Sequence, residues 1–134
     1  MRLFLVRHAE AEPGEPDVLR KLTAHGRRQA RELGARLAAE GAGGAAVVTS
    51  PLLRARETAE EIARALGTTP APDERLAPGA TAETVREAAD EQSADKVVAV
   101  GHQPDCSRIA ADLAGGPEPA FPTAGVVVID LPAG

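Results

Sequence analysis

The chain has 134 residues, enough for one domain but not for two that would each bury an adequate core, so we expect a single domain over residues 1–134. Its 20 acidic and 15 basic residues give a net charge of -5, which opposes sequence-independent binding to nucleic acid. The sequence has no signal pattern and no apolar run of about twenty residues, which predicts a cytoplasmic protein with no membrane partner.

A single cysteine, Cys106, excludes an intrachain disulfide, and no Cys or His spacing is typical of a zinc site. Aromatic residues make up 1 % of the chain, so Leu, Val and Ala must fill the interior. We expect Cys106 to be a small buried apolar residue.

The N-terminal segment predicts a strand followed by a helix. Arg2–Val6 is an aliphatic run that ends at the charged pair Arg7 and His8, as in a strand that delivers polar groups to its carboxyl end. After the N-cap candidate Thr23, apolar residues recur at three- and four-residue spacing until Gly41 stops the pattern.

A second strand and helix follow. Ala45–Thr49 is a short apolar run, and we interpret Ser50 and Pro51 as the cap and first-turn proline of a helix that ends at Gly67. The proline-rich stretch 68–81 predicts a surface loop with at most a short strand.

The last part of the chain continues the alternation. Thr81 caps a predicted helix that runs to about Gln92, and Lys96–Val100 is the clearest strand pattern. Asp105–Leu113 predicts another helix and Gly125–Leu131 a final strand. Alternating strands and helices predict an α/β fold of three layers, with a mostly parallel central sheet and helices on both faces. Ligands of such sheets collect beyond the carboxyl ends of the strands.

Polar groups follow three of the predicted strands, namely Arg7 with His8, Arg54, and His102. All three strand ends should open on one edge of the sheet. Two imidazoles and two guanidiniums repel one another there unless the imidazoles stay neutral or an anion lies between them. Each piece alone is typical of an ordinary loop, but the combination predicts a phosphoryl site.

The residue types fit phosphoryl transfer. Arginines bind phosphoryl oxygens through paired charge-assisted hydrogen bonds, and a neutral histidine attacks phosphorus and holds it as a phosphoramidate. We therefore predict that His8 is the nucleophile and that Arg7 and Arg54 bind the phosphoryl group. His102 and the backbone amide of Gln103 are predicted to donate further hydrogen bonds to it.

These residues stand in segments that resemble the signatures of the histidine phosphatase superfamily, which has the phosphoglycerate mutase-like fold. Leu5–Glu10 is similar to its Arg-His-Gly signature, with Ala9 in place of Gly. Leu22–Ala30 is similar to its Leu-Thr-x-x-Gly-x-x-Gln-Ala helix start. Ser50–Ala59 and Val100–His102 are similar to its second-arginine and second-histidine segments, so the resemblance covers nearly the whole chain.

The resemblance implies the same roles: His8 as the nucleophile, and Arg7, Arg54 and His102 as the phosphate pocket. It also implies a mixed sheet, no cofactor and no metal ion, since the arginines supply the charge that a divalent ion would otherwise supply. It is strongest to the short SixA-type phosphohistidine phosphatases, because long insertions that cover small substrates do not fit in this length. Arg20, before the Leu-Thr motif, is then either a border of the phosphate or phosphoprotein or an ordinary loop charge.

Many members of the superfamily carry an acidic proton donor after the third strand, where this chain has Asp73, Glu74 and Arg75. Arg75 falls at or beside that position. An alkoxide leaving group needs a proton donor, whereas imidazole leaves phosphorus more readily, especially once protonated. The pattern favours phosphohistidine in a protein as the substrate, with the role of Asp73 or Glu74 left open.

Two alternatives stay open. A small-molecule phosphomonoesterase of the same superfamily would act on a small phosphorylated substrate and would need a proton donor. A non-catalytic phosphate-binding regulatory module would need the arginines but not a nucleophilic imidazole. We interpret His25, at a variable position of the helix-start segment, as a surface residue.

Overall fold

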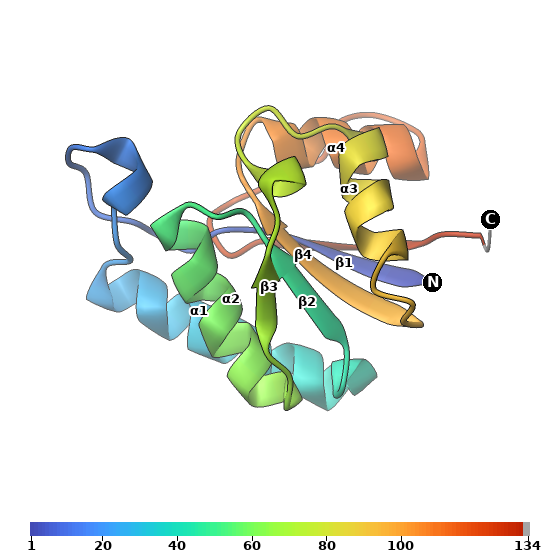
Figure 1. Ribbon diagram of the computed structural model, residues 1–134, viewed down its shortest axis with the longest axis horizontal. Coiled ribbons are helices and arrows are strands. Elements are labelled where there is room, and N and C mark those ends of the chain that lie inside the picture. The colour runs from blue at the N-terminus through green and yellow to red at the C-terminus, as the bar shows by residue number, and fades with distance from the viewer. Residues whose placement is uncertain (133–134) are drawn as a thin grey trace.

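The computed structural model describes residues 1–132 and contains a central sheet with helices on both faces (Figure 1). The strands are β1 (Arg2–Arg7), β2 (Ala46–Thr49), β3 (Pro70–Pro72), β4 (Lys96–Gly101) and β5 (Val126–Asp130). Their order is β3-β2-β4-β1-β5, and every neighbouring pair is parallel except β1 and β5. The predicted three-layer α/β fold with a mostly parallel sheet is confirmed, and the sheet is mixed.

Within residues 1–132, four α-helices and three shorter turns of helix connect the strands. They are α1 (Ala24–Leu37), α2 (Leu53–Leu66), α3 (Ala82–Asp90), α4 (Asp105–Ala114), the 3₁₀ helices η1 (Asp17–Leu19) and η3 (Glu74–Leu76), and the π-helical turn η2 (Ala38–Ala42). Thr23 and Thr81 cap α1 and α3 as predicted, because each hydroxyl accepts a hydrogen bond from the backbone N–H three residues later.

The predicted cap of α2 is wrong. The helix begins at Leu53, and its N-cap residue, Leu52, has no side-chain cap. Ser50 lies before the helix, where its hydroxyl contacts the backbone N–H of Leu52 and the ring of His102. Ser50 is therefore part of the loop that follows β2, next to the candidate site.

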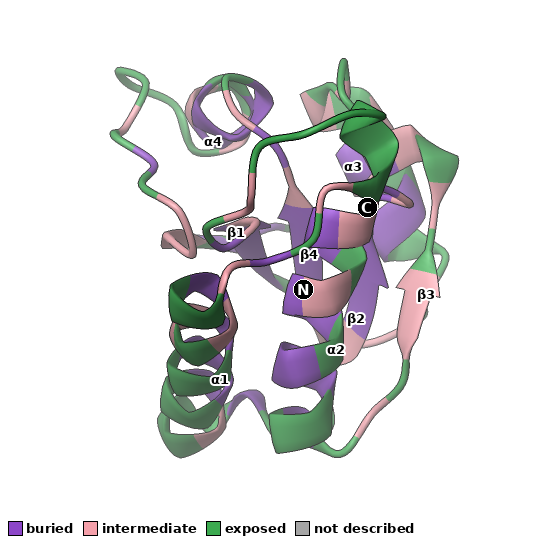
Figure 2. Cartoon of the chain, turned by 90° about the vertical axis from the view of Figure 1, so that its left-hand side faces the viewer, coloured by how far each residue is buried: buried purple, intermediate pink, exposed green. Residues whose placement is uncertain are grey.

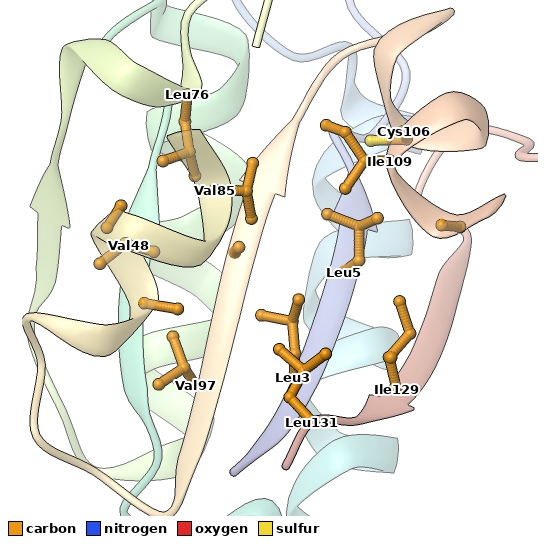
Figure 3. Packing of buried hydrophobic residues seen from close by; sticks show 14 of the residues in the cluster. Leu3, Leu5, Val48, Leu76, Val85, Val97, Cys106, Ile109, Ile129 and Leu131 are labelled. Atoms are coloured by element: carbon orange, nitrogen blue, oxygen red, sulfur yellow. The ribbon is translucent and has the colours of Figure 1, made fainter. Parts of the chain in front are cut away.

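Alternating side chains of β1 serve the two faces of the sheet. Leu3 and Leu5 pack with α3 and α4, and Figure 3 shows Leu5 beside Ile109 and Leu3 near Leu131 on that face. Phe4 and Val6 pack on the opposite face with α1 and α2. Figure 2 shows the result, with buried inner strands and with helices that expose only their outer sides.

Cys106 lies in the α4 layer, 1 % exposed, as predicted for a small apolar residue (Figure 3). Burial raises the pKa of its thiol to about 12. The thiol is therefore not a reactive group at neutral pH.

The register of the strands aligns their carboxyl ends. Arg7 at the end of β1 pairs with Gly101 at the end of β4, and Thr49 at the end of β2 pairs with Val100. The residues that follow, His8, Ser50 and His102, therefore emerge at one edge of the sheet.

Candidate active site

The structure brings the two predicted site histidines together. The ring centroids of His8 and His102 are 5.3 Å apart, and the rings are inclined by 55°. His102 is 4 % exposed and His8 is partly buried. Both imidazoles thus belong to one partly enclosed site at the carboxyl ends of β1 and β4.

The hydrogen bond of His8 determines its tautomer. Nδ1 lies 2.7 Å from the carbonyl oxygen of Ala9, and a carbonyl oxygen can only accept, so Nδ1 carries the proton. In the neutral ring, Nε2 then has a free lone pair. Burial, followed by the charges of Arg54, Arg7 and Arg20, lowers the pKa of His8 to about 4 despite the bond to Ala9. The ring is therefore neutral at pH 7, as a nucleophile requires.

The backbone beside His8 is tied to α2. The amide of Ala9 donates to the hydroxyl of Thr58 at 3.0 Å, and that hydroxyl donates to the carbonyl of Arg54 at 2.8 Å. Thr58 is fully buried. It therefore links the loop of His8 to the helical turn that carries Arg54.

The start of α1 supports the same loop from the other side. The amide of Thr23 donates to the carbonyl of Glu10 at 3.0 Å. Gly26 lies so close that an added Cβ would overlap this carbonyl oxygen and come within 2.8 Å of its carbon. The glycine of the Leu-Thr-x-x-Gly segment is thus required by the approach of α1 to the loop after His8.

The arginines are held by backbone carbonyls and by one carboxylate. Arg7 donates through Nη1 to the carbonyl of Phe121 at 2.9 Å. Arg54 donates through its two Nη atoms to the carbonyl and carboxylate oxygens of Asp17, at 3.0 and 3.3 Å. Arg20 donates to the same carboxylate at 3.1 Å and to the carbonyl of Glu12 at 2.7 Å.

Asp17 therefore bridges Arg20 and Arg54, whose like charges would otherwise repel each other. Hydrogen bonding to Arg20, together with the charge of Arg54, lowers the pKa of the Asp17 carboxyl. Asp17 could not be predicted from the sequence, because a lone aspartate in a loop carries no signal of a partner 37 residues away in the chain. The same holds for Thr58 and for the carbonyl of Phe121.

Burial lowers the pKa of His102 to about 4, and the nearby charges of His8 and Arg54 add to this effect. Its Nε2 lies 2.8 Å from the hydroxyl oxygen of Ser50. The side chain of Gln103 bonds to the backbone and hydroxyl of Ser107, at the start of α4. The helix itself begins two residues later than Gln103, at Asp105.

Four side-chain polar atoms within residues 1–132 are buried without a hydrogen-bond partner, and three of them lie in this site. They are Nε of Arg7, Nε of Arg54 and Nδ1 of His102, the fourth being the hydroxyl of Thr68. Buried polar groups are normally satisfied. The guanidinium nitrogens are donors, and both arginines lie near enough to His8 to lower its pKa, so this cluster of donors and neutral imidazoles suits a bound anion.

Asp73, Glu74 and Arg75 follow β3 and form the turn η3. Arg75 donates to both oxygens of Asp73 at 3.0 and 2.8 Å and also binds Glu91 of the segment after α3. These hydrogen bonds lower the pKa of Asp73. Glu74 is exposed.

His25 is exposed on α1, as predicted. Within residues 1–132, no three His, Cys, Asp or Glu side chains gather in a way that could hold a metal ion. In the same range, every helix is too short or too polar to cross a membrane.

Comparisons with known proteins identify the family of the chain. The model of the histidine phosphatase superfamily, branch 1, matches residues 3–78. No curated protein matches the chain significantly.

Three solved structures illustrate the similarity of fold. The protein histidine phosphatase SixA complexed with tungstate is 26% identical with a TM-score of 0.86, over 96% of this chain and 86% of that one. The putative phosphohistidine phosphatase SixA of Agrobacterium tumefaciens is 26% identical with a TM-score of 0.83, over 97% and 91%. A mycobacterial glucosyl-3-phosphoglycerate phosphatase shares the fold at 21% identity and a TM-score of 0.73, over 95% and 88%. Because the family model matches more than half of the chain, the protein belongs to branch 1 of the histidine phosphatase superfamily.

Proposed function

We propose that the protein is a phosphatase that hydrolyses phosphohistidine in a protein substrate through a phosphoryl intermediate on His8. The free Nε2 lone pair of His8 supports the nucleophilic role, because the bond from Nδ1 to Ala9 leaves Nε2 unprotonated. The unpaired Nε atoms of Arg7 and Arg54 support the binding of the phosphoryl oxygens.

The reaction has two steps. In the first, Nε2 of His8 attacks phosphorus in line with the P–N bond of the substrate. A new N–P bond forms on His8, while the electron pair of the broken bond stays on the leaving imidazole, which takes a proton from solvent. Water then attacks phosphorus and gives up a proton to solvent, while cleavage of the N–P bond on His8 releases orthophosphate and returns the electron pair to Nε2.

The protein provides electrostatic stabilisation in both steps. As Nε2 forms its bond, positive charge develops on the ring, and the carbonyl of Ala9 accepts a stronger hydrogen bond from Nδ1. Arg7 and Arg54 bind the charge that is spread over the phosphoryl oxygens in the transition state. The phosphoryl dianion in turn offsets the repulsion between these arginines and the imidazolium.

The ionised state of Asp73 is the observation that favours a phosphoramidate over a phosphoester as the substrate. Arg75 binds both oxygens of Asp73 and lowers its pKa, so this carboxyl is ionised at neutral pH and has no proton to donate. An alkoxide leaving group needs such a proton from the enzyme, whereas a phosphohistidine ring that is protonated from solvent at its other nitrogen leaves as neutral imidazole. The 26% identity to two SixA proteins points to the same substrate class.

The rim of the site supports a protein substrate. Val18 and Leu19 of η1 are 52% and 63% exposed, although large aliphatic side chains are usually buried. They directly follow Asp17, which binds Arg54. Exposed apolar side chains at this position favour contact with the protein surface around a phosphohistidine side chain.

An activity panel tests the proposal. Purified protein is offered a phosphohistidine-bearing protein, phosphoramidate, a sugar phosphate and a nucleotide, each beside a His8→Ala control. We expect turnover of the phosphohistidine protein that His8→Ala abolishes, and slow or no turnover of the esters. If wild type and His8→Ala behave identically on every phosphohistidine protein, the proposal fails.

The same panel separates the two alternatives. Strong ester turnover that is lost on Glu74→Gln favours a small-molecule phosphomonoesterase, in which this exposed carboxyl supplies the proton. A phosphate-binding module without turnover forms no acid-labile phosphate on His8 in a single-turnover experiment. Trapped acid-labile phosphate that is absent from His8→Ala excludes the binding module.

A further inference from the structure

Ser50 is the residue that contacts the ring of His102. It is fully buried in the loop after β2, and its backbone amide donates to the carbonyl of Val100 at 3.0 Å. This bond fixes Ser50 beside the end of β4. Its hydroxyl oxygen lies 2.8 Å from Nε2 of His102 and 3.2 Å from the backbone nitrogen of Leu52.

The donors and acceptors at this hydroxyl determine where its proton lies. The amide of Leu52 can only donate, so it uses a lone pair of the hydroxyl oxygen. The hydroxyl proton then needs an acceptor, and within residues 1–132 the one in reach is Nε2 of His102. A nitrogen that accepts a hydrogen bond carries no proton, so the single proton of the neutral ring is on Nδ1.

We propose that Ser50 is a positioning residue that holds His102 in the Nδ1–H tautomer, so that Nδ1 donates a hydrogen bond to the phosphoryl group. Nδ1 is buried and has no protein partner, which agrees with a donor directed at a ligand. The opposite tautomer would place a lone pair against a phosphoryl oxygen, and the two would repel each other. The ligand in this inference rests on the proposed function, whereas the tautomer itself does not.

Both histidines are then Nδ1–H tautomers, but His8 attacks phosphorus whereas His102 binds the phosphoryl group. The carbonyl of Ala9 accepts from Nδ1 of His8 and leaves a lone pair on Nε2 for attack. The hydroxyl of Ser50 donates to Nε2 of His102 and leaves an N–H at Nδ1 for binding. One backbone acceptor and one hydroxyl donor thus give two neutral imidazoles, 5.3 Å apart, different functions.

Nitrogen-15 NMR of the histidine rings at pH 7 tests the tautomer directly. The chain has three histidines, so comparison with His25→Gln and His8→Ala assigns the signals of His102. We expect a protonated Nδ1 and an unprotonated Nε2 in the wild-type protein, with the Nδ1 resonance shifting when orthophosphate is added. A protonated Nε2 in the wild-type protein overturns the proposal, and this measurement needs no variant of Ser50.

Variants of Ser50 test the cause of the tautomer. Ser50→Ala removes the donor, and we expect the ring to move toward the Nε2–H tautomer, with about a tenfold loss of kcat/KM and of orthophosphate affinity. Ser50→Thr retains the hydroxyl and should retain the tautomer. Ser107→Ala removes another buried hydroxyl, bonded to the carbonyl of Pro119, and should leave the ring signals of His102 unchanged.

A Ser50→Ala protein with an unchanged His102 tautomer overturns the role of Ser50. The result is independent of the proposed function, because the ring spectra are read without turnover. A protein with the expected tautomer that hydrolyses no phosphohistidine contradicts the proposed function alone.

Discussion

Substitution of Gly26 by alanine tests whether the loop of His8 depends on the close approach of α1. An added Cβ would overlap the carbonyl oxygen of Glu10 and lie 2.8 Å from its carbon, about 1 Å inside the ordinary contact of about 3.5–4.0 Å. These atoms are backbone and cannot rotate away. We therefore expect α1 and the loop of residues 8–10 to separate.

Gly34 is the matched control, because it lies in the same helix. Its added Cβ would meet the Cβ of Ala65 at 3.0 Å and the carbonyl oxygen of Glu61 at 3.1 Å, a smaller overlap. Alanine gains about 1 kcal/mol of helix propensity at either position. Overpacking costs about 1–3 kcal/mol or more, so we expect Gly26→Ala to lose at least about 2 kcal/mol and Gly34→Ala to stay within about 1 kcal/mol of wild type.

Two assays measure the effect. Far-UV circular dichroism follows thermal unfolding, and a loss of about 2 kcal/mol lowers the Tm by roughly 6 °C in a chain of this size. Activity reports the displacement, since a shift of about 1 Å at the nucleophile costs up to about 100-fold in rate. If Gly26→Ala matches Gly34→Ala in both Tm and activity, the close approach of α1 does not hold the loop in place.

Three further predictions concern acidity, the rim and the turn after β3. The folded-state pKa of His8 and of His102 is near 4, below the ordinary 6.5, so the unfolded chain binds more protons between these values. The contribution of these histidines to the free energy of unfolding should therefore be complete above pH 6.5 and decrease toward pH 4 by up to about 3 kcal/mol per histidine. Urea unfolding at pH 7 and pH 5 measures this loss, which should be smaller in His8→Ala. Leu19→Ser should raise the KM for a phosphohistidine protein about fivefold and the KM for phosphoramidate much less. Val128→Ser, at another exposed aliphatic residue, should change neither KM. Equal effects of the two variants would contradict a role of Leu19 in docking the protein substrate. Arg75→Gln should raise the pKa of Asp73 toward 3.8 in a carboxyl NMR titration, and an unchanged value would mean that Arg75 does not hold Asp73 ionised.

Local sequence patterns predicted the helices and strands well where a residue type occurs mainly in one structural role. Lys96–Val100 forms most of a buried central strand because its apolar run fits a strand covered on both faces. Thr81 caps α3 because its hydroxyl has a backbone partner three residues away, and Thr84 completes a capping box. Such interactions are local, so the sequence contains both partners within one window.

The prediction that Ser50 caps α2 was wrong because the partner of its hydroxyl is distant in the sequence. A serine before a proline is typical of a helix N-terminus, but a hydroxyl also bonds to any group that the fold brings near it. Here that group is His102, which is 52 residues away in the chain. The bridge from Asp17 to Arg54 was beyond local patterns for the same reason, as was the direction of β5.

The bond from Arg7 to the carbonyl of Phe121 joins positions 114 residues apart, and β1 is paired with β5 along its length. A chain that is still being synthesised therefore contains His8 from the start, but not the carbonyl that anchors Arg7 beside it. Phosphatase activity should appear on the ribosome only after the segment from Phe121 through β5 has left the exit tunnel. An incomplete chain released earlier would carry His8, Arg7 and Arg54 without the carbonyl that anchors Arg7, so we expect premature products to be inactive.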